Sequence, residues 1–242
     1  MKTFLFILIV IASGATAGFI LGGLNLIFVE PSLDQAIGIE NQHMFASGIE
    51  KDTPEFRAQY NDYRTWQKSG QVFAGGIFGI SIGSLFGIVF ALSRNSLPGK
   101  IDIKKSLILA GIMWACIYFI PFLKYPANPP TVGDPETVVL RGILYLTFIT
   151  ISGFGAVGFY KLSKKLKTRK FIVVVGYAAF IGIAFVAMPG NPDKITTPMD
   201  LVNHFRIMSV FTVSLYWLSL GLIFGSLWNH YKPHKEITSS FN

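Results

Sequence analysis

Cysteine is almost absent from this sequence of 242 residues, and histidine is scarce. The one cysteine, Cys116, lies inside an apolar run, so it excludes an internal disulfide and a multi-cysteine metal site. We expect it to be a small buried residue. A haem between helices needs histidines at facing positions within spans, and we expect no haem and no other tightly bound cofactor. The four histidines fall in loops or at the edges of apolar runs: His43, His204, His230 and His234.

Charged residues make up only 14% of the chain, whereas hydrophobic residues make up 51%. This composition is too apolar for a soluble domain and indicates an integral membrane protein. The net charge of +8 would favour nucleic acid as the partner of a soluble protein. Here the basic residues cluster between apolar runs, where they determine topology instead. We therefore expect membrane lipids as partners and no nucleic acid.

Catalytic motifs are also missing. The sequence has no Gly-x-Ser-x-Gly, no His-Glu-x-x-His, no phosphate-binding glycine loop and no pair of carboxylates inside an apolar run. No recognised set of catalytic residues therefore supports an enzymatic function, and we expect the chain not to be an enzyme.

Six apolar runs are each long enough to approach the thickness of a bilayer. We predict an all-α polytopic membrane protein, with residues 1–242 forming one membrane domain of six transmembrane helices in three hairpins. Between the runs, 13 basic residues fall on one side and 6 on the other, which predicts that both termini are cytoplasmic. The predicted spans are about 4–29, 70–92, 105–123, 138–160, 171–188 and 205–228.

The first apolar run permits two interpretations. Residues 15–17, Ala-Thr-Ala, fit a small-residue signal-peptidase site, so the segment before them could be removed. The apolar character continues through Val29, however, which gives about 26 residues where 20 suffice to cross a bilayer. We favour an uncleaved first span.

The longest polar segment, residues 30–68, is predicted to be a long outer loop that contains an amphipathic helix at about 54–68. Asp52 or Thr53 can cap that helix, and Pro54 suits its first position. Aromatic residues then repeat at i, i+4 and i+7: Phe56, Tyr60 and Tyr63. Such a helix lies at the membrane interface, runs straight into the second span, or offers a surface to a partner.

Glycines recur every four residues in the first two spans, which places each row on one helix face. Helix backbones approach closely along such faces, so we predict that these two helices pack as a tight hairpin. The second row could instead line a conduit or a subunit contact. The rows are Gly14, Gly18 and Gly22, followed by Gly75, Gly79, Gly83 and Gly87.

The segment 121–141 carries five prolines, so it is neither helix interior nor central strand. Apolar runs flank it, and we predict a stiff loop at a membrane surface. Pro121 is expected to end the third span. Lys124 and Tyr125 suit the headgroup layer, and Arg141 lies one turn into the next helix. A rigid connector with no other role is the alternative.

This pattern resembles one known family. Pro-x-x-Lys-Tyr-Pro-x-x-x-Pro with a short acidic segment and an arginine after it, Phe-Val-Glu-Pro at 28–31, and Phe-Arg at 205–206 are similar to the CbtA family of predicted cobalt transporter membrane subunits. The resemblance implies a multi-pass subunit in the plasma membrane of a prokaryote. It also implies a cargo of cobalt or another divalent cation and a second, small membrane subunit or a larger complex.

Polar groups at membrane depth are costly and usually have a task, so they are the candidates for a transport site. Glu30, His43 and His204 could offer oxygen and imidazole ligands to a divalent cation, although each could equally be a solvated loop residue. Positive charges nearby would repel that cation unless carboxylates neutralise them. The outer-face motif and gate candidates are Asn25, Glu30, Lys124, Tyr125, Asn128, Glu136, Arg141 and Arg206.

Arg141 and Arg206 occupy similar places, each after a proline-ended span and an Asn/Pro-rich loop. This similarity could reflect an internal repeat or only the rules of span ends. Each arginine needs an acceptor near the membrane boundary, and Glu30 is the nearest by depth, with Glu136 and proline-loop carbonyls as alternatives. Two functions remain open: a transporter subunit, or an accessory subunit that packs within a larger membrane complex.

Overall fold

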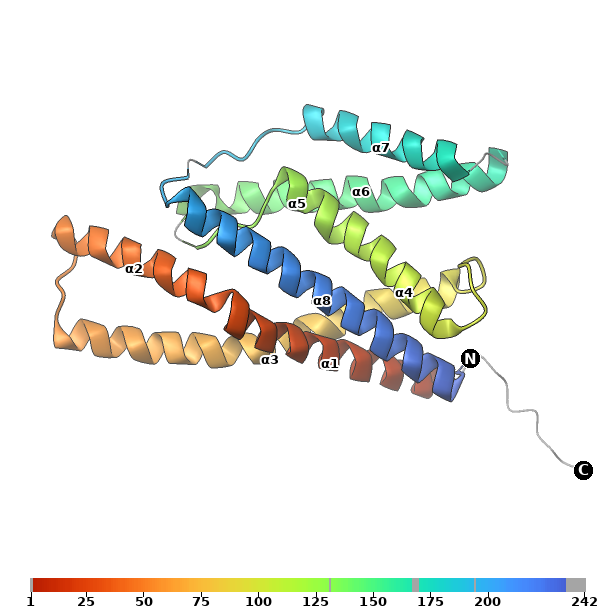
Figure 1. Cartoon of the computed structure of the whole chain (residues 1–242), viewed down its shortest axis with the longest axis horizontal. Helices are drawn as coiled ribbons and strands as arrows, with labels where there is room; N and C mark the ends of the chain where they lie inside the picture. The colour runs from red at the N-terminus through yellow and green to blue at the C-terminus, as the bar shows by residue number, and fades with distance from the viewer. Residues whose placement is uncertain (1, 131, 167–169, 194, 234–242) are drawn as a thin grey trace, which may run out of the picture.

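The computed structural model describes residues 2–130, 132–166, 170–193 and 195–233, so His234 lies outside the described residues. Every regular element among the described residues is helical. Figure 1 shows their arrangement. The elements are α1 (Thr3–Phe28), α2 (Glu30–Ala46), α3 (Pro54–Ser93), α4 (Asp102–Met113), η1 (Trp114–Phe119), α5 (Ile120–Lys124), η2 (Pro135–Thr137), α6 (Val138–Leu166), α7 (Lys170–Ala187) and α8 (Met199–Tyr231).

Within the described residues, five helices are long and apolar enough to cross a membrane: α1, α3, the continuous helix Asp102–Lys124, the helix Pro135–Lys165, and α8. α7 is shorter, and its 18 residues extend about 27 Å, which is the lower end of the spanning range. Many large apolar side chains point outward, among them Phe154 at 73% and Val186 at 85% exposure. Such a surface needs lipid around it. The protein is an all-α polytopic membrane protein.

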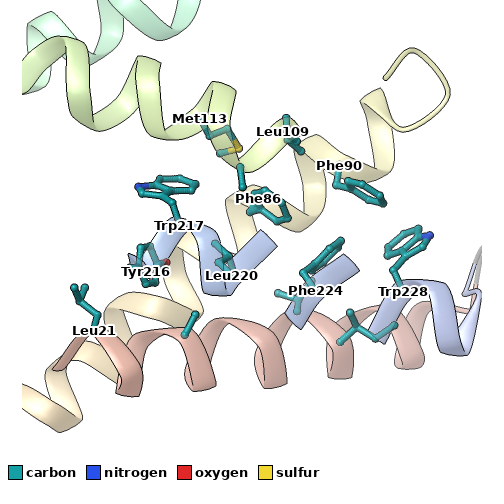
Figure 2. Packing of buried hydrophobic residues seen from close by; sticks show 14 residues of the cluster. Leu21, Phe86, Phe90, Leu109, Met113, Tyr216, Trp217, Leu220, Phe224 and Trp228 are labelled. Atoms are coloured by element: carbon teal, nitrogen blue, oxygen red, sulfur yellow. The ribbon is translucent and has the colours of Figure 1, made fainter. Parts of the chain in front are cut away.

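α8 is the central helix of the bundle. Its buried residues recur at i+3 and i+4, so one stripe faces α1, α3 and α4. Figure 2 shows Phe86 and Phe90 of α3 packed against Phe224 and Trp228 of α8, with ring centroids 5.0–5.1 Å apart for three of these pairs. The stripe on α8 comprises Tyr216, Trp217, Leu220, Phe224 and Trp228.

This position of α8 changes the predicted pairing of helices. α1 and α3 do pack as one antiparallel pair, but α8 packs on α1 and α4, and α7 packs on α6. The third and fourth spans also meet, through η1, α5 and α6, but α7 and α8 do not pack closely on each other as the predicted third hairpin requires. The physical reason is the aromatic stripe on α8, which is buried only when two other helices cover it.

The segment 30–68, predicted as an outer loop with an amphipathic helix at about 54–68, is mostly helical. α2 begins directly after α1, with Pro31 in its first turn, where a missing N–H costs nothing. α3 begins at Pro54 behind a Thr53 cap, since the Phe56 amide donates to Thr53 Oγ1 at 3.2 Å. It then runs for 40 residues, about 60 Å, so the amphipathic helix leads straight into the second span. We call residues 30–69 the arm (Figure 1).

Pro121 does not end the third span, contrary to expectation, since the helix continues to Lys124. The six residues Trp114–Phe119, which end two positions before Pro121, form a π-helical segment, η1. A proline lacks the N–H that an α-helix would use and clashes with the preceding turn. The wider π turn accommodates both effects, so the chain passes through Pro121 without ending the helix.

α1 and α3 touch backbone to backbone along their glycines. A Cβ atom on Gly14 would lie 2.5 Å from the Gly79 carbonyl oxygen, and one on Gly75 would lie 2.6 Å from the Gly18 oxygen. Any side chain there would overlap the opposite backbone. This contact leaves no room for a conduit between α1 and α3.

Candidate functional site

A cavity of about 520 Å³ lies where α5 and α6 meet the two proline-rich loops, residues 125–134 and 188–198. We call it the proline-loop cavity. Its walls combine aromatic rings and prolines with a few polar groups, a composition typical of small-ligand sites. The polar groups are Tyr118, Tyr125, Asn128, Arg141, Tyr145 and Asn191. It thus contains three of the predicted motif residues: Tyr125, Asn128 and Arg141.

Arg206 holds one wall of the cavity in place. It lies on α8, and its Nη2 donates to Asn128 Oδ1 at 2.7 Å while its Nε donates to the Ala127 carbonyl at 3.3 Å. A charged donor on two acceptors of one loop fixes that loop more firmly than neutral hydrogen bonds would. Burying a guanidinium without hydrogen-bond acceptors costs free energy. The two acceptors therefore stabilise the position of Arg206 as well as the loop.

Arg141 holds the opposite wall. Its Nε lies 2.7 Å from Asp193 Oδ2, and the Asp193 side chain is only 1% exposed. Thr137 Oγ1 donates to the other Asp193 oxygen at 2.6 Å. Gly133, with φ of +112°, leaves space for the pair, because a Cβ there would lie 2.8 Å from Arg141 Nη1.

The contacts of the two arginines are therefore crossed between the two loops. The arginine that follows the first proline loop binds the second loop, and the arginine that follows the second loop binds the first. The expected acceptor, Glu30, serves neither arginine. The proline-loop carbonyls that we considered as alternatives do accept from both, through Ala127 O and Asp134 O.

Lys124 and Tyr125 attach α5 to the end of α7. Lys124 Nζ donates to the Phe185 carbonyl at 2.7 Å and lies 4.8 Å from the centre of the Phe185 ring. Tyr125 OH donates to the Pro189 carbonyl at 2.7 Å. These contacts satisfy carbonyls at the C-terminal end of α7, where a cation is favourable.

Glu30 lies at the base of the arm, in a cluster that the sequence did not suggest. Its carboxylate accepts from Arg64 Nη2, and both side chains are 7% exposed. Asp34 also accepts from Arg64, at 2.8 Å, and from Lys68, at 2.7 Å. Gln71 Nε2 donates to Glu30 at 3.3 Å. We call these five residues the arm-base cluster.

The arm-base cluster shifts the titration of Asp34. Partial burial acts to raise its pKa, but the hydrogen bonds from Lys68 and Arg64 outweigh that effect. The net result is a pKa below the ordinary aspartate value. Arg64 shows the complementary change, since its acidic partners overcome burial and raise its pKa.

The structure does not bring Glu30, His43 and His204 together as a metal site. Glu30 is occupied by Arg64, and His43 lies 13 residues farther along α2, about 20 Å away. His204 Nδ1 hydrogen-bonds Ser32 Oγ at 2.7 Å, which ties α8 to α2. Across the described ranges, no three His, Cys, Asp or Glu side chains gather around one point. Within the described residues these three side chains therefore do not share one site, and a metal role for any one of them stays a prediction.

The last two motif residues lie apart from the cavity. Asn25 is half-buried near the end of α1, and its carbonyl accepts from the Val29 amide at 2.9 Å. Glu136 is exposed in η2, and its amide donates to Asp134 Oδ1 at 2.9 Å. Neither side chain contributes to the lining of the proline-loop cavity.

A comparison with models of protein families shows to which family this chain belongs. The model described as "Probable cobalt transporter subunit (CbtA)" matches residues 4–229, nearly the whole length. The chain belongs to the CbtA family. No curated protein and no solved structure matches it.

The CbtA match includes the arm, the glycine contact and the proline-loop cavity, so all three are features of a CbtA-family chain. Two residues of this CbtA protein were missed by sequence reasoning. Asp193 follows an Asn-Pro pair and looked like a loop residue, and Arg64 looked like one charge on an amphipathic helix. The signal for Arg64 was the strict helical spacing of Arg64 and Lys68, opposite Glu30 and Asp34.

Proposed function

We propose that this CbtA-family protein is the multi-pass subunit of a transporter for cobalt or another divalent cation, in the plasma membrane of a prokaryote. The proline loops and the arm lie outside the cell, and both termini are cytoplasmic. The family description as a subunit supports a second membrane protein as its partner.

The Arg141–Asp193 pair carries this proposal. Arg141 lines the proline-loop cavity, and the carboxylate of its partner Asp193 is almost completely shielded from solvent. Asp134 lies beside it, since the Asp134 amide donates to Asp193 Oδ1 at 3.4 Å. A divalent cation that competes with Arg141 for Asp193 would find a carboxylate, backbone carbonyls and hydroxyls, which are the ligands that hard and borderline cations accept. The pair thus acts as a gate that the cation itself opens.

The test is metal accumulation in intact cells. We expect Arg141→Gln to alter cellular cobalt and nickel by severalfold, because Asp193 loses its counter-charge, and Asp193→Asn to abolish the response to external cobalt. Immunoblots of membrane fractions check that each variant is inserted. Arg57→Gln is the matched control, since Arg57 pairs with Asp52 on the exposed side of the arm.

The competing function is an accessory subunit without transport. Close packing of α1 on α3 favours it, because the glycine contact excludes a path between those helices. In that case Arg141→Gln should reduce the amount of partner chain that co-purifies and leave cobalt and nickel unchanged. That result would overturn the transporter proposal.

A further inference from the structure

A second large crevice, of about 550 Å³, lies between the second half of α3, α4 with η1, and α6, and neither proline loop contributes to its lining. Its lining is almost wholly apolar, and Leu109, Met113 and Cys116 form its buried floor. Besides its contact with α7, α6 packs on η1 and α5, beyond the C-terminal end of α4. The crevice is therefore the space left where α6 separates from α3 and α4.

The depth of the crevice corresponds to one leaflet of a bilayer. Its lining on α6 extends from Ile149 to Tyr160, which are 11 helical steps or about 17 Å apart. One leaflet contributes about 15 Å of hydrocarbon. A transmembrane helix about 10 Å wide and 30 Å long fills about 2400 Å³, so it fits neither the length nor the volume. The acyl chains of one leaflet match the length of the crevice.

The end of the crevice at the α3–α4 connection is basic and hydroxylated. Lys164 Nζ lies 4.8 Å from the centre of the Tyr160 ring and donates to Ser96 Oγ at 3.2 Å, and both of these partners line the crevice. Lys105 lies on the face of α4 that continues through Leu109 and Ile112 into the lining. No carboxylate among the described residues pairs with either lysine, whereas the neighbouring Arg94 is neutralised by Asp102 at 2.6 Å.

We propose that this crevice binds one anionic phospholipid, with its acyl chains between α3, α4 and α6 and its phosphate against Lys164 and Lys105. Two unneutralised ammonium groups at the mouth of an apolar slot complement a phosphodiester above two hydrocarbon chains. The lipid connects α6 to the α1–α3–α4–α8 core on the side where protein contacts are few. The inference is independent of metal transport.

Native mass spectrometry of the full chain tests the proposal, after reconstitution in nanodiscs of phosphatidylglycerol and phosphatidylcholine. We expect the wild-type chain to retain phosphatidylglycerol selectively. The double variant Lys105→Gln/Lys164→Gln should bind it about 25-fold more weakly, because each basic residue near the surface contributes about fivefold. Lys100→Gln/Lys104→Gln removes the same charge from residues that do not continue into the lining, and it should retain the lipid.

A second pair of variants tests the slot without changing charge. Gly153 lines the crevice and Gly158 does not, and a Cβ on either would meet nothing within 4 Å. Gly153→Leu should fill the slot and release the lipid, while Gly158→Leu should keep it, with both proteins monodisperse on gel filtration. Equal retention by all variants, or equal retention of the two lipids by the wild type, would refute the site. Dimer formation by Gly153→Cys under oxidation would assign the crevice to a second copy instead.

Discussion

Arg206 on α8 donates to Asn128 of the first proline loop at 2.7 Å, although 78 residues separate them in the sequence. The reciprocal contact joins Arg141 on α6 to Asp193 of the second loop. Each proline loop is thus held by the helix that follows the other loop. The proline-loop cavity has the shape that these two crossed contacts impose.

Crossed contacts predict crossed effects on loop mobility. Arg206→Gln should accelerate amide exchange about tenfold in the segment containing Ala127 and Asn128, since a charge-assisted hydrogen bond is lost. Exchange at 191–193 should stay unchanged. Arg141→Gln should do the reverse, and hydrogen-exchange mass spectrometry distinguishes the two patterns. If both variants loosen both loops equally, the loops move as one unit and the crossed arrangement has no separate effects.

The Glu30–Arg64 pair should be important for stability because both partners are buried. Glu30→Gln or Arg64→Gln leaves a buried charge with fewer partners, which costs about 3 kcal/mol. Thermal unfolding in detergent measures the loss, and the double variant should lose less than the sum. Arg57→Gln breaks an exposed pair and should cost about 0–1 kcal/mol. A similar cost for Arg57→Gln would show that burial is not the cause.

The glycine contact predicts a large cost for a single methyl group. Gly79→Ala should destabilise the protein by about 1–3 kcal/mol, because its Cβ overlaps the Gly14 carbonyl and the Gly18 backbone. Gly23→Ala, on a face of α1 where a Cβ meets nothing within 4 Å, should be neutral or slightly stabilising. The yield and melting temperature of inserted protein measure both. Equal losses would mean that helix propensity, and not contact, governs these positions.

Acid should weaken the arm through Asp34. Because its folded pKa lies below the unfolded value of 3.8, Asp34 contributes stability that is complete above that value and is lost as the pH falls through the folded pKa. The difference in melting temperature between wild type and Asp34→Asn should therefore shrink from pH 5 to pH 3. Asp62→Asn, which changes a carboxylate with no ion pair among the described residues, serves as the control. A constant difference would exclude the ion pairs as the source.

Topology can be measured with single cysteines in a Cys116→Ala background. Ser47→Cys, just after α2, should react with an impermeant reagent in intact cells. Ser163→Cys, near the end of α6, should react only after the membrane is opened. The opposite result would invert the orientation and place the proline-loop cavity on the cytoplasmic side.

Local pattern was sufficient for much of the fold. Apolar runs identified the six segments that become helices, because a span must be apolar along its whole length. The glycine rows indicated which faces of α1 and α3 touch, since a four-residue period has one geometric meaning on a helix. Asp52 and Thr53 were the two expected caps of the helix at about 54–68, and the structure has Thr53 as the cap and Pro54 as the first residue of α3.

The remaining features depend on distant partners. Asp193 becomes a gate candidate only when the second proline loop folds beside the first, and no local pattern encodes that meeting. In the sequence, α8 resembles the other apolar spans. In the structure, its aromatic stripe is buried at the centre of the bundle. Pro121 was expected to end the third span because proline usually ends a helix. Here the π-helical segment η1 accommodates the proline, which has no N–H, so the helix continues.

α3 is one uninterrupted helix that joins the arm to the crevice, and the glycine contact with α1 lies between these two ends. Gly79 lies about 37 Å from the arm end of α3 and about 21 Å from Ser93, which lines the crevice. A partner that displaces the tip of the arm by about 4 Å therefore moves the opposite end by about 2 Å if the helix pivots rigidly. On this geometry, a displacement of the arm would change the width of the crevice at the opposite end of α3.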